Sequence, residues 1–114
     1  MKNIALGIIC FSALQLHAQT GSISGKITDD KKQPIADAIV VASQNNVPVG
    51  GTTTDKEGKY TIKSLHTGSY DVKARKMEYG ARLNSYINVA ADKITPLDFT
   101  LYLKSPNSQP VKVH

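Results

Sequence analysis

The sequence predicts an all-β protein, more specifically a seven-stranded antiparallel Greek-key β-sandwich. Between residues 20 and 103, short segments with alternating apolar and polar residues follow one another, and this period of two is typical of half-buried strands. Turn-forming residues separate the segments at intervals of about 8–12 residues, the spacing of sandwiches and barrels. No stretch sustains the apolar period of about 3.6 residues that an amphipathic helix requires.

The seven expected strands differ in how clearly their residues alternate. They span residues 23–28, 38–42, 52–54, 59–63, 69–75, 83–89 and 97–103. The second segment is apolar throughout, which is typical of a well-buried strand. Before the third segment, residues 47–51 are irregular, and Pro48 suits an edge strand or a bulge. The last segment alternates most strongly and begins just after Pro96.

Polar turns are expected between these strands. Residues 29–34 form a polar turn closed by a proline, and Asn45-Asn46 interrupts the chain after the second segment. Residues 55–58 combine an Asp that accepts backbone hydrogen bonds with a Gly that takes the left-handed conformation. Residues 66–68 and 91–93 turn the chain again.

Alternation also predicts which side chains form the core. One-sided burial in an antiparallel sheet explains the polar residues between them. The expected inward set is Ile23, Ile27, Ile39, Val41, Tyr60, Ile62, Leu65, Tyr70, Val72, Leu83, Ile87, Val89, Leu97, Phe99 and Leu101.

The first 18 residues have the order of a secretory signal peptide. A charged start at Lys2 precedes the largely apolar residues 4–16 and the small residue Ala18, after which we expect cleavage. A membrane anchor or a first core strand are the alternative interpretations. Lipid attachment at Cys10 is disfavoured because the residue before it, Ile9, is not small. The expected location is therefore periplasmic, outer-membrane-associated or secreted.

The composition narrows the possible functions. The chain has 114 residues, one Cys, no Trp and three His, which excludes a disulfide-stapled miniprotein, a Cys-based zinc site and a multi-domain enzyme. Cleavage removes Lys2 and Cys10 and leaves a mature chain of 96 residues with a net charge of +4 and no thiol. The predicted domain is residues 19–103, and residues 104–114 are expected to be a disordered tail.

Four blocks of the mature chain carry a family resemblance. They read GKITD (25–29), QPIADAIV (33–40), TTDKEGKYTI (53–62) and LHTGSYDV (65–72). In order and spacing they resemble the carboxypeptidase regulatory-like domain, a transthyretin-like (prealbumin-like) sandwich of secreted bacterial proteins. The chain departs from the family pattern at Asp37, usually Gly, and at Glu78-Tyr79, commonly Gly-Tyr.

The resemblance implies an accessory domain without catalytic residues or a cofactor. Such domains sit beside metallocarboxypeptidase domains or at the N-terminus of outer-membrane receptors for large nutrients. The residues that carry the pattern have structural explanations, as turn formers, close-approach glycines or core side chains. They are Gly25, Pro34, Asp55, Gly58, Tyr60, Gly68 and Tyr70.

Chemistry-bearing residues are sparse. We expect no catalytic and no metal site, since His66 and His114 are the only histidines after cleavage, and Ser64 and Ser69 are too near His66 on one hairpin to form a triad with it. The acidic pairs at residues 29–30 and 55–57 leave calcium as an alternative, disfavoured by the lysines among them.

Two surface features are candidate binding sites. Lys59, Lys63, Lys73 and Arg75 point away from the core and share one face if their strands form a hairpin. That basic face suits an acidic glycan, an anionic membrane or an acidic protein, and the alternative is a solvated sheet face. Nucleic acid is not expected as a partner of an exported chain without aromatics on that face.

Tyr86 and Tyr102 are out of phase with their inward neighbours and form a candidate glycan platform. Asn84, Asn88 and Thr100 are expected to be polar neighbours of this pair. An exposed aromatic pair suits sugar rings, which stack on flat apolar faces.

The sequence therefore predicts a non-catalytic exported interaction module of the bacterial cell envelope, with a carbohydrate-binding protein as the alternative. It leaves open a truncated receptor leader, and its edge strands permit dimers by strand addition.

Overall fold

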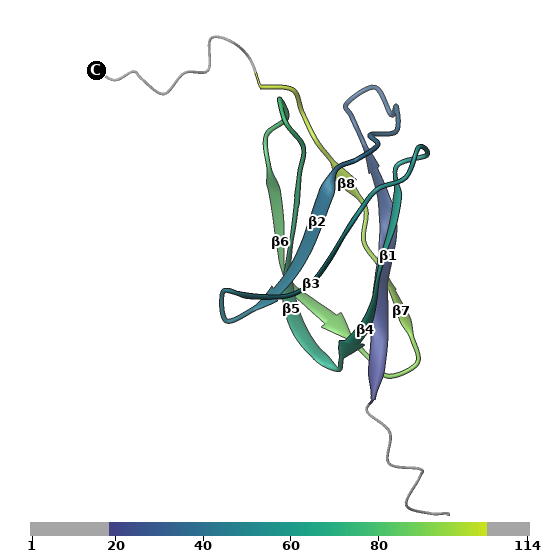
Figure 1. Ribbon diagram of the computed structural model, residues 1–114, viewed down its shortest axis with the longest axis vertical. Coiled ribbons are helices and arrows are strands. Elements are labelled where there is room, and N and C mark those ends of the chain that lie inside the picture. The colour runs from purple at the N-terminus through teal and green to yellow at the C-terminus, as the bar shows by residue number, and fades with distance from the viewer. Residues whose placement is uncertain (1–18, 105–114) are drawn as a thin grey trace, which may run out of the picture.

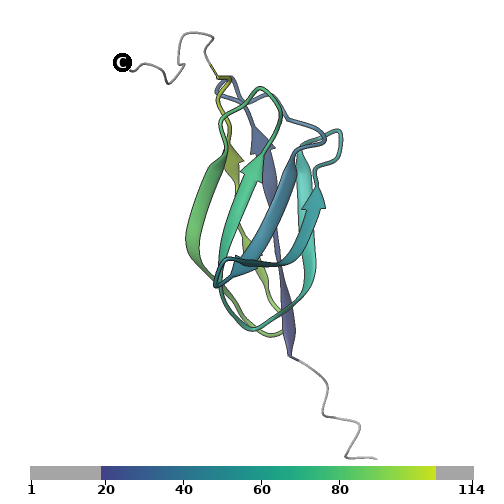
Figure 2. The same cartoon turned by 60° about the vertical axis from the view of Figure 1, so that its left-hand side comes forward.

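Two β-sheets pack face to face in the computed structural model, which describes residues 19–104 (Figure 1). The strands are β1 (Thr20–Thr28), β2 (Ile39–Gln44), β3 (Val47–Thr53), β4 (Lys59–His66), β5 (Gly68–Arg75), β6 (Arg82–Val89), β7 (Ile94–Pro96) and β8 (Phe99–Thr100). Sheet I has the order β4-β1-β7, with β8 also paired to β1, and sheet II has the order β3-β2-β5-β6 (Figure 2). The predicted all-β sandwich is confirmed. The predicted signal peptide and most of the predicted tail lie outside the described residues.

The C-terminal part of the chain differs from the single antiparallel strand predicted over residues 97–103. Here β7 and β8 are separate and both run parallel to β1. The two strands are separated where a side-chain oxygen, and not a strand carbonyl, accepts a hydrogen bond from β1. The Leu97 N–H donates to the Ser24 carbonyl, whereas the Lys26 N–H donates to Oδ1 of Asp98 at 2.8 Å instead of to a strand carbonyl.

The break requires a glycine on β1. A Cβ on Gly25 would lie 1.7 Å from the carbonyl oxygen of Leu97. No side chain fits at that distance, so Gly25 allows the two backbones to meet. Beyond the break Phe99 and Leu101 are buried as predicted, and Leu103 is exposed.

A two-residue hairpin joins β2 to β3, where the sequence predicted an interruption followed by irregular chain. Asn45 and Asn46 both have positive φ, 51° and 65°, as a type I′ turn requires. Asn tolerates this conformation better than other non-glycine residues, so the pair continues the sheet instead of ending it. β3 lies at the edge of sheet II, and the register shifts opposite Pro48, which agrees with the expected edge or bulge position.

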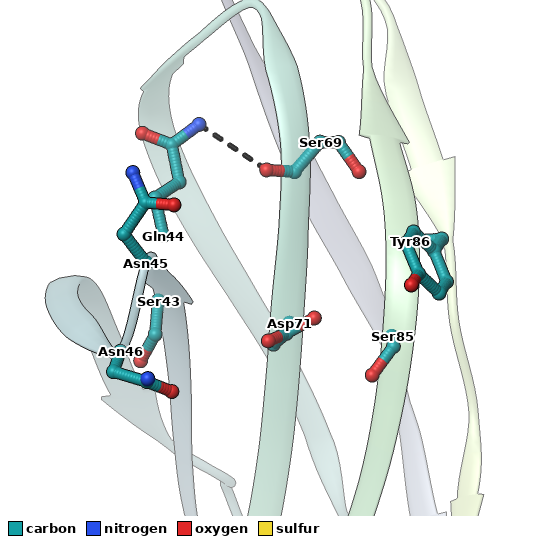
Figure 3. A pocket seen from close by; sticks show the side chains of 8 residues that line it. All are labelled: Ser43, Gln44, Asn45, Asn46, Ser69, Asp71, Ser85 and Tyr86. Atoms are coloured by element: carbon teal, nitrogen blue, oxygen red, sulfur yellow. Dashed lines mark hydrogen bonds between the residues drawn. The ribbon is translucent and has the colours of Figure 1, made fainter.

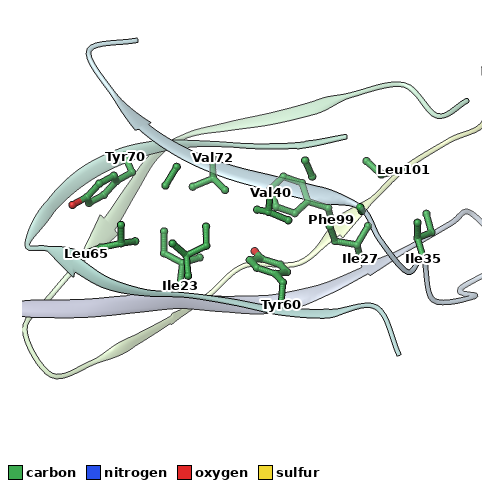
Figure 4. Packing of buried hydrophobic residues seen from close by; sticks show 14 of the residues in the cluster. Ile23, Ile27, Ile35, Val40, Tyr60, Leu65, Tyr70, Val72, Phe99 and Leu101 are labelled. Atoms are coloured by element: carbon green, nitrogen blue, oxygen red, sulfur yellow. The ribbon is translucent and has the colours of Figure 1, made fainter. Parts of the chain in front are cut away.

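The interior between the sheets is filled by aliphatic and aromatic side chains (Figure 4). Tyr60 and Tyr70 are buried as predicted, and each donates a hydrogen bond from its phenol to a backbone carbonyl: Tyr60 to Leu97 at 2.5 Å and Tyr70 to His66 at 2.6 Å. The two rings therefore contribute apolar contact area while their polar ends are satisfied.

The prediction of which face of β2 is buried was wrong. Ile39 and Val41 were expected inside, but the buried residues of this segment are Ala38, Val40 and Ala42. Because the segment is apolar on both faces, alternation could not select the inner one. Outside, Ile39 and Val41 pair with Arg75 and Lys73 of β5.

Leu83 was also predicted inside and is 58% exposed. A β-bulge in β6 explains the error. Val72 pairs with Asn84 and Tyr70 pairs with Ile87, so two residues of β6 stand opposite the single residue Asp71. The extra residue reverses the alternation, and Leu83 and Ile87 therefore point to opposite faces.

Candidate functional site

The outer face of sheet II carries a polar hollow with a volume of about 520 Å³ (Figure 3). Three side-chain amides, three serines, one carboxylate and one phenol line it. These residues are Ser43, Gln44, Asn45, Asn46, Ser69, Asp71, Ser85 and Tyr86. The volume lies within the range of small-molecule sites, about 300–1,000 Å³.

Asp71 of β5 lies in the middle of this hollow because of the strand pairing. On one side it pairs with Ser43 of β2, and on the other side the bulge places Ser85 and Tyr86 opposite it. The hairpin turn adds Asn45 and Asn46 at the end of the hollow. Residues of β2, of its turn and of β6 therefore surround a carboxylate of β5.

Most polar groups of the hollow are free to bind a ligand. Among the described residues, Gln44 is the one lining residue whose side chain makes a hydrogen bond, from Nε2 to the Ser69 carbonyl at 3.2 Å (Figure 3). Asp71 is half-buried, and within residues 19–104 its carboxylate has neither a hydrogen bond nor an ion pair. The remaining amide, hydroxyl and carboxylate groups retain their donors and acceptors.

Tyr86 is held in an unusual conformation at the rim of the hollow. Its φ is 60°, a region that bulky side chains rarely occupy, and its side chain is 87% exposed. The sequence indicated an exposed ring here but not the bulge that aims it.

Tyr102 lies in a different hollow of about 490 Å³, on the outer side of sheet I, with Lys26, Asp29 and Asp98. The Arg82 guanidinium carbon is 5.9 Å from the Tyr102 ring centroid, within the range of a cation–π contact. The structure therefore does not bring together the two members of the expected glycan platform. Of their expected neighbours, Thr100 lines the hollow of Tyr102, and neither Asn84 nor Asn88 lines the hollow of Tyr86.

The four cations of the expected basic face are divided between the sheets. Lys59 and Lys63 extend from β4 in sheet I, whereas Lys73 and Arg75 extend from β5 in sheet II. One shared face would require a β4–β5 hairpin. The structure has no such hairpin among its described strands, because β4 pairs with β1 and β5 pairs with β2. The chain changes sheets at Gly68, whose φ is 151°.

The two pairs of cations differ in their surroundings. Nζ of Lys59 forms an exposed ion pair of 3.4 Å with Glu57. Around Lys73 and Arg75 the outer face of sheet II is apolar, with Ile39, Val41 and Leu83 as cross-strand neighbours. We call these five residues of sheet II the basic-apolar patch.

The acidic turn residues have structural roles. Oδ1 of Asp29 accepts the N–H groups of Lys31 and Gln33, and Oδ1 of Asp55 accepts those of Glu57 and Lys59. The hydrogen bond from the Lys59 N–H is the largest cause that lowers the pKa of Asp55. Within residues 19–104 no three His, Cys, Asp or Glu side chains are grouped as a metal site. The same residues include no helix long and apolar enough to cross a membrane.

Residues 22–102 match the carboxypeptidase regulatory-like domain. The chain belongs to this family. The residues of the regulatory-like domain pattern hold the sandwich together: Gly58 has a φ of 77°, and a Cβ there would lie 2.5 Å from the Ile27 carbonyl oxygen. Pro34 forms an isolated bridge with Thr28 beside it.

Two curated relatives share part of this regulatory-like domain. Structural protein 27 of a virus, isolate Australia/Victoria, is 41% identical over 58 residues, which are 51% of this chain and 10% of that protein. The TonB-dependent transporter Oar of Myxococcus xanthus is 30% identical over 92 residues, 79% of this chain and 8% of that protein. The chain therefore spans a tenth or less of the length of these relatives.

Solved structures with the same fold come from several functional classes. A type II cohesin–X-dockerin complex of Acetivibrio cellulolyticus matches with a TM-score of 0.60 and 24% identity, over 73% of this chain and 58% of that chain. The 5-hydroxyisourate hydrolase of Klebsiella pneumoniae matches with a TM-score of 0.58 and 16% identity, over 75% and 92%. A minor pilin of Streptococcus agalactiae matches with 0.57 and 16%, over 83% and 49%. The regulatory-like domain thus shares its fold with enzymes and with non-catalytic proteins alike.

Proposed function

We propose that this domain is a non-catalytic, exported interaction module of a bacterial cell envelope, of the kind that precedes outer-membrane nutrient receptors. The similarity to a TonB-dependent transporter over 79% of the chain supports this assignment. The family membership supports the accessory role. The non-catalytic role is supported by the turn carboxylates of Asp29 and Asp55, which already accept hydrogen bonds from backbone N–H groups.

The observation that carries the proposal is the parallel pairing of the first and last strands. The start of β1 lies beside β7 and its end lies beside β8. The chain therefore enters the sandwich at one end and leaves it at the other (Figure 1). This geometry suits a leader module, because a segment that follows the sandwich would extend away from its N-terminal end.

The basic-apolar patch is the surface that we assign to the partner. Protein interfaces favour an apolar centre with Arg, and this patch combines Ile39, Val41 and Leu83 with Lys73 and Arg75. A hollow of about 370 Å³ adjoins it, lined by residues that include Arg75 and the exposed Met77. A partner with an apolar contact surrounded by carboxylates would complement both features.

Affinity capture of the tagged mature chain from its native envelope, followed by mass spectrometry, tests the proposal. We expect one envelope protein to be enriched, and the double substitution Lys73→Glu/Arg75→Glu to abolish the capture. The matched control is Lys59→Glu/Lys63→Glu, which reverses two charges on the opposite sheet and should leave the capture intact. Equal loss with both variants would show a non-specific charge effect, and no enriched protein would refute the assignment.

A further inference from the structure

The polar hollow around Asp71 adjoins the basic-apolar patch on sheet II but shares no residue with it, and the proposed module function does not explain it. Its lining groups, carboxylate, amide and hydroxyl, are those that pair with the hydroxyls of a sugar, since each of them accepts or donates hydrogen bonds in defined directions. Gln44 is oriented by its bond to the Ser69 carbonyl, and the other side chains have no partner among the described residues.

The charge of the hollow selects the class of ligand. Of the residues that the structure describes, Asp71 is the one ionisable group in the lining apart from the phenol of Tyr86, and none of the lining side chains is a cation. Lys73 and Arg75 extend from the same strand but lie outside the hollow. A lining with one carboxylate and no cation disfavours phosphates, uronates and sulfates, and the carboxylate accepts hydrogen bonds from the hydroxyls of a neutral ligand.

The conformation of Tyr86 is the second, independent observation. An aromatic residue at a φ of 60° is strained, and backbone strain of this kind is concentrated at functional sites. The strain arises at a bulge, a feature that re-aims side chains, and the bulge stands opposite Asp71. Its result is a ring that is 87% exposed beside a hollow of hydrogen-bonding groups. Such a ring offers an apolar plane against which one face of a pyranose stacks.

We infer that this hollow is a binding site for a neutral saccharide. The Asp71 carboxylate and the amides of Asn45 and Asn46 bind ring hydroxyls, and Tyr86 stacks against the sugar at the rim. The site therefore uses one of the two tyrosines singled out from the sequence, together with residues of the β2–β3 turn that the sequence did not indicate as ligands.

Titration of the ¹⁵N-labelled mature chain with neutral oligosaccharides tests the site. The probes are hexasaccharides of glucose, mannose, galactose and xylose, with polygalacturonate and dextran sulfate as anionic comparisons. We expect amide shifts confined to residues 43–46, 69–71 and 85–86 with at least one neutral probe. Binding only to the anionic probes, shifts elsewhere, or no binding to any neutral probe would overturn the inference.

Two variants assign the roles of the residues. Asp71→Asn keeps the shape and removes the charge, and we expect affinity to fall about tenfold or more. Tyr86→Asn removes the ring and places a residue that tolerates positive φ, so affinity should fall while the melting temperature stays equal to or above that of the parent. Tyr102→Ala, an exposed tyrosine of the other hollow, is the matched control and should bind normally.

The melting temperature separates this role from a structural one. A lower melting temperature with unchanged affinity in Tyr86→Asn would mean that the ring supports the fold, and the inference would be wrong. Arg75→Glu alone, four residues from Asp71 on β5, should weaken the partner capture and leave sugar binding unchanged, so failure of the proposed partner interaction and failure of this site are distinguishable.

Discussion

The phenol of Tyr60 on β4 donates a 2.5 Å hydrogen bond to the carbonyl oxygen of Leu97, which lies in the break between β7 and β8. The bond spans β1, because β4 and the C-terminal strands pair with opposite edges of that strand. One side chain thereby fixes the irregular part of sheet I to a regular strand. The ring also lies 6.3 Å from that of Phe99, measured between centroids.

The substitution Tyr60→Phe should destabilise the fold by about 1–3 kcal/mol, because it leaves a partly buried carbonyl without its donor. The free energy of unfolding from urea denaturation measures this loss. Tyr86→Phe removes an exposed phenol and should change stability little. Equal stability of both variants would show that the Leu97 carbonyl finds another donor.

The same phenol predicts a stability loss at alkaline pH. Burial, and secondly the negative charge of Asp98, raise the pKa of Tyr60 well above its ordinary value of 10.0. The folded state then holds a proton that the unfolded state releases, so stability is complete below pH 10 and falls as the pH rises above it. Denaturation midpoints between pH 8 and 12 test this, and Tyr60→Phe should have a flatter profile.

Asp55 predicts the corresponding effect in acid. Its pKa is lowered from 3.8, chiefly by the hydrogen bond from the Lys59 N–H, so its contribution is present above that value and is lost as the pH falls through the lower folded pKa. Asp55→Asn removes the charge and with it this contribution to stability, so the acid denaturation midpoint should shift to a higher pH. Asp30→Asn, in a different turn, is the control and should leave the midpoint in place.

Gly25→Ala should prevent the close approach of β1 to Leu97 and cost about 3 kcal/mol or more, since the new methyl group would meet backbone and not a flexible side chain. Gly80→Ala is the matched control, because a Cβ there lies 3.8 Å from the nearest atom, the Tyr102 carbonyl oxygen. Thermal unfolding compares the two. Similar melting temperatures would contradict the need for glycine at residue 25.

The parallel pairing of β1 with β7 and β8 predicts mechanical resistance. Force applied between Thr20 and Leu103 loads the bonds of these strands together, whereas force between Thr20 and His66, which are paired neighbours, opens the β1–β4 ladder one bond at a time. Single-molecule pulling through cysteines introduced at these positions should give the higher force for the first pair. A lower or equal force would show that the terminal pairing does not resist tension along the chain.

Local patterns predicted strands well where one face is polar. In β4 and β5 the alternation around Tyr60 and around Tyr70 and Val72 gave both the element and its inner face, and these residues are buried. Alternation failed where both faces are apolar, as at Ile39 and Val40, because the pattern then does not indicate which face is buried. It also failed at Leu83, because a bulge depends on the opposing strand.

The polar hollow was the least predictable feature. Its residues come from β2, its turn, β5 and β6, and they meet only through pairing across sheet II. Its local signals were Tyr86, which is out of phase with its inward neighbours, and the Asn45-Asn46 pair, which indicates a type I′ hairpin when read as two residues that tolerate positive φ.

Residues that are neighbours in the chain were enough to predict the all-β class, the family, most of the strands and the structural residues of the turns. Hydrophobic alternation and turn chemistry act over that short range. Only the tertiary structure decided which strands share a sheet. This arrangement divided the four cations between two faces, separated Tyr86 from Tyr102, and placed Asp71 opposite a bulge. Each of these relationships depends on pairing between residues distant in the chain, which no local pattern specifies.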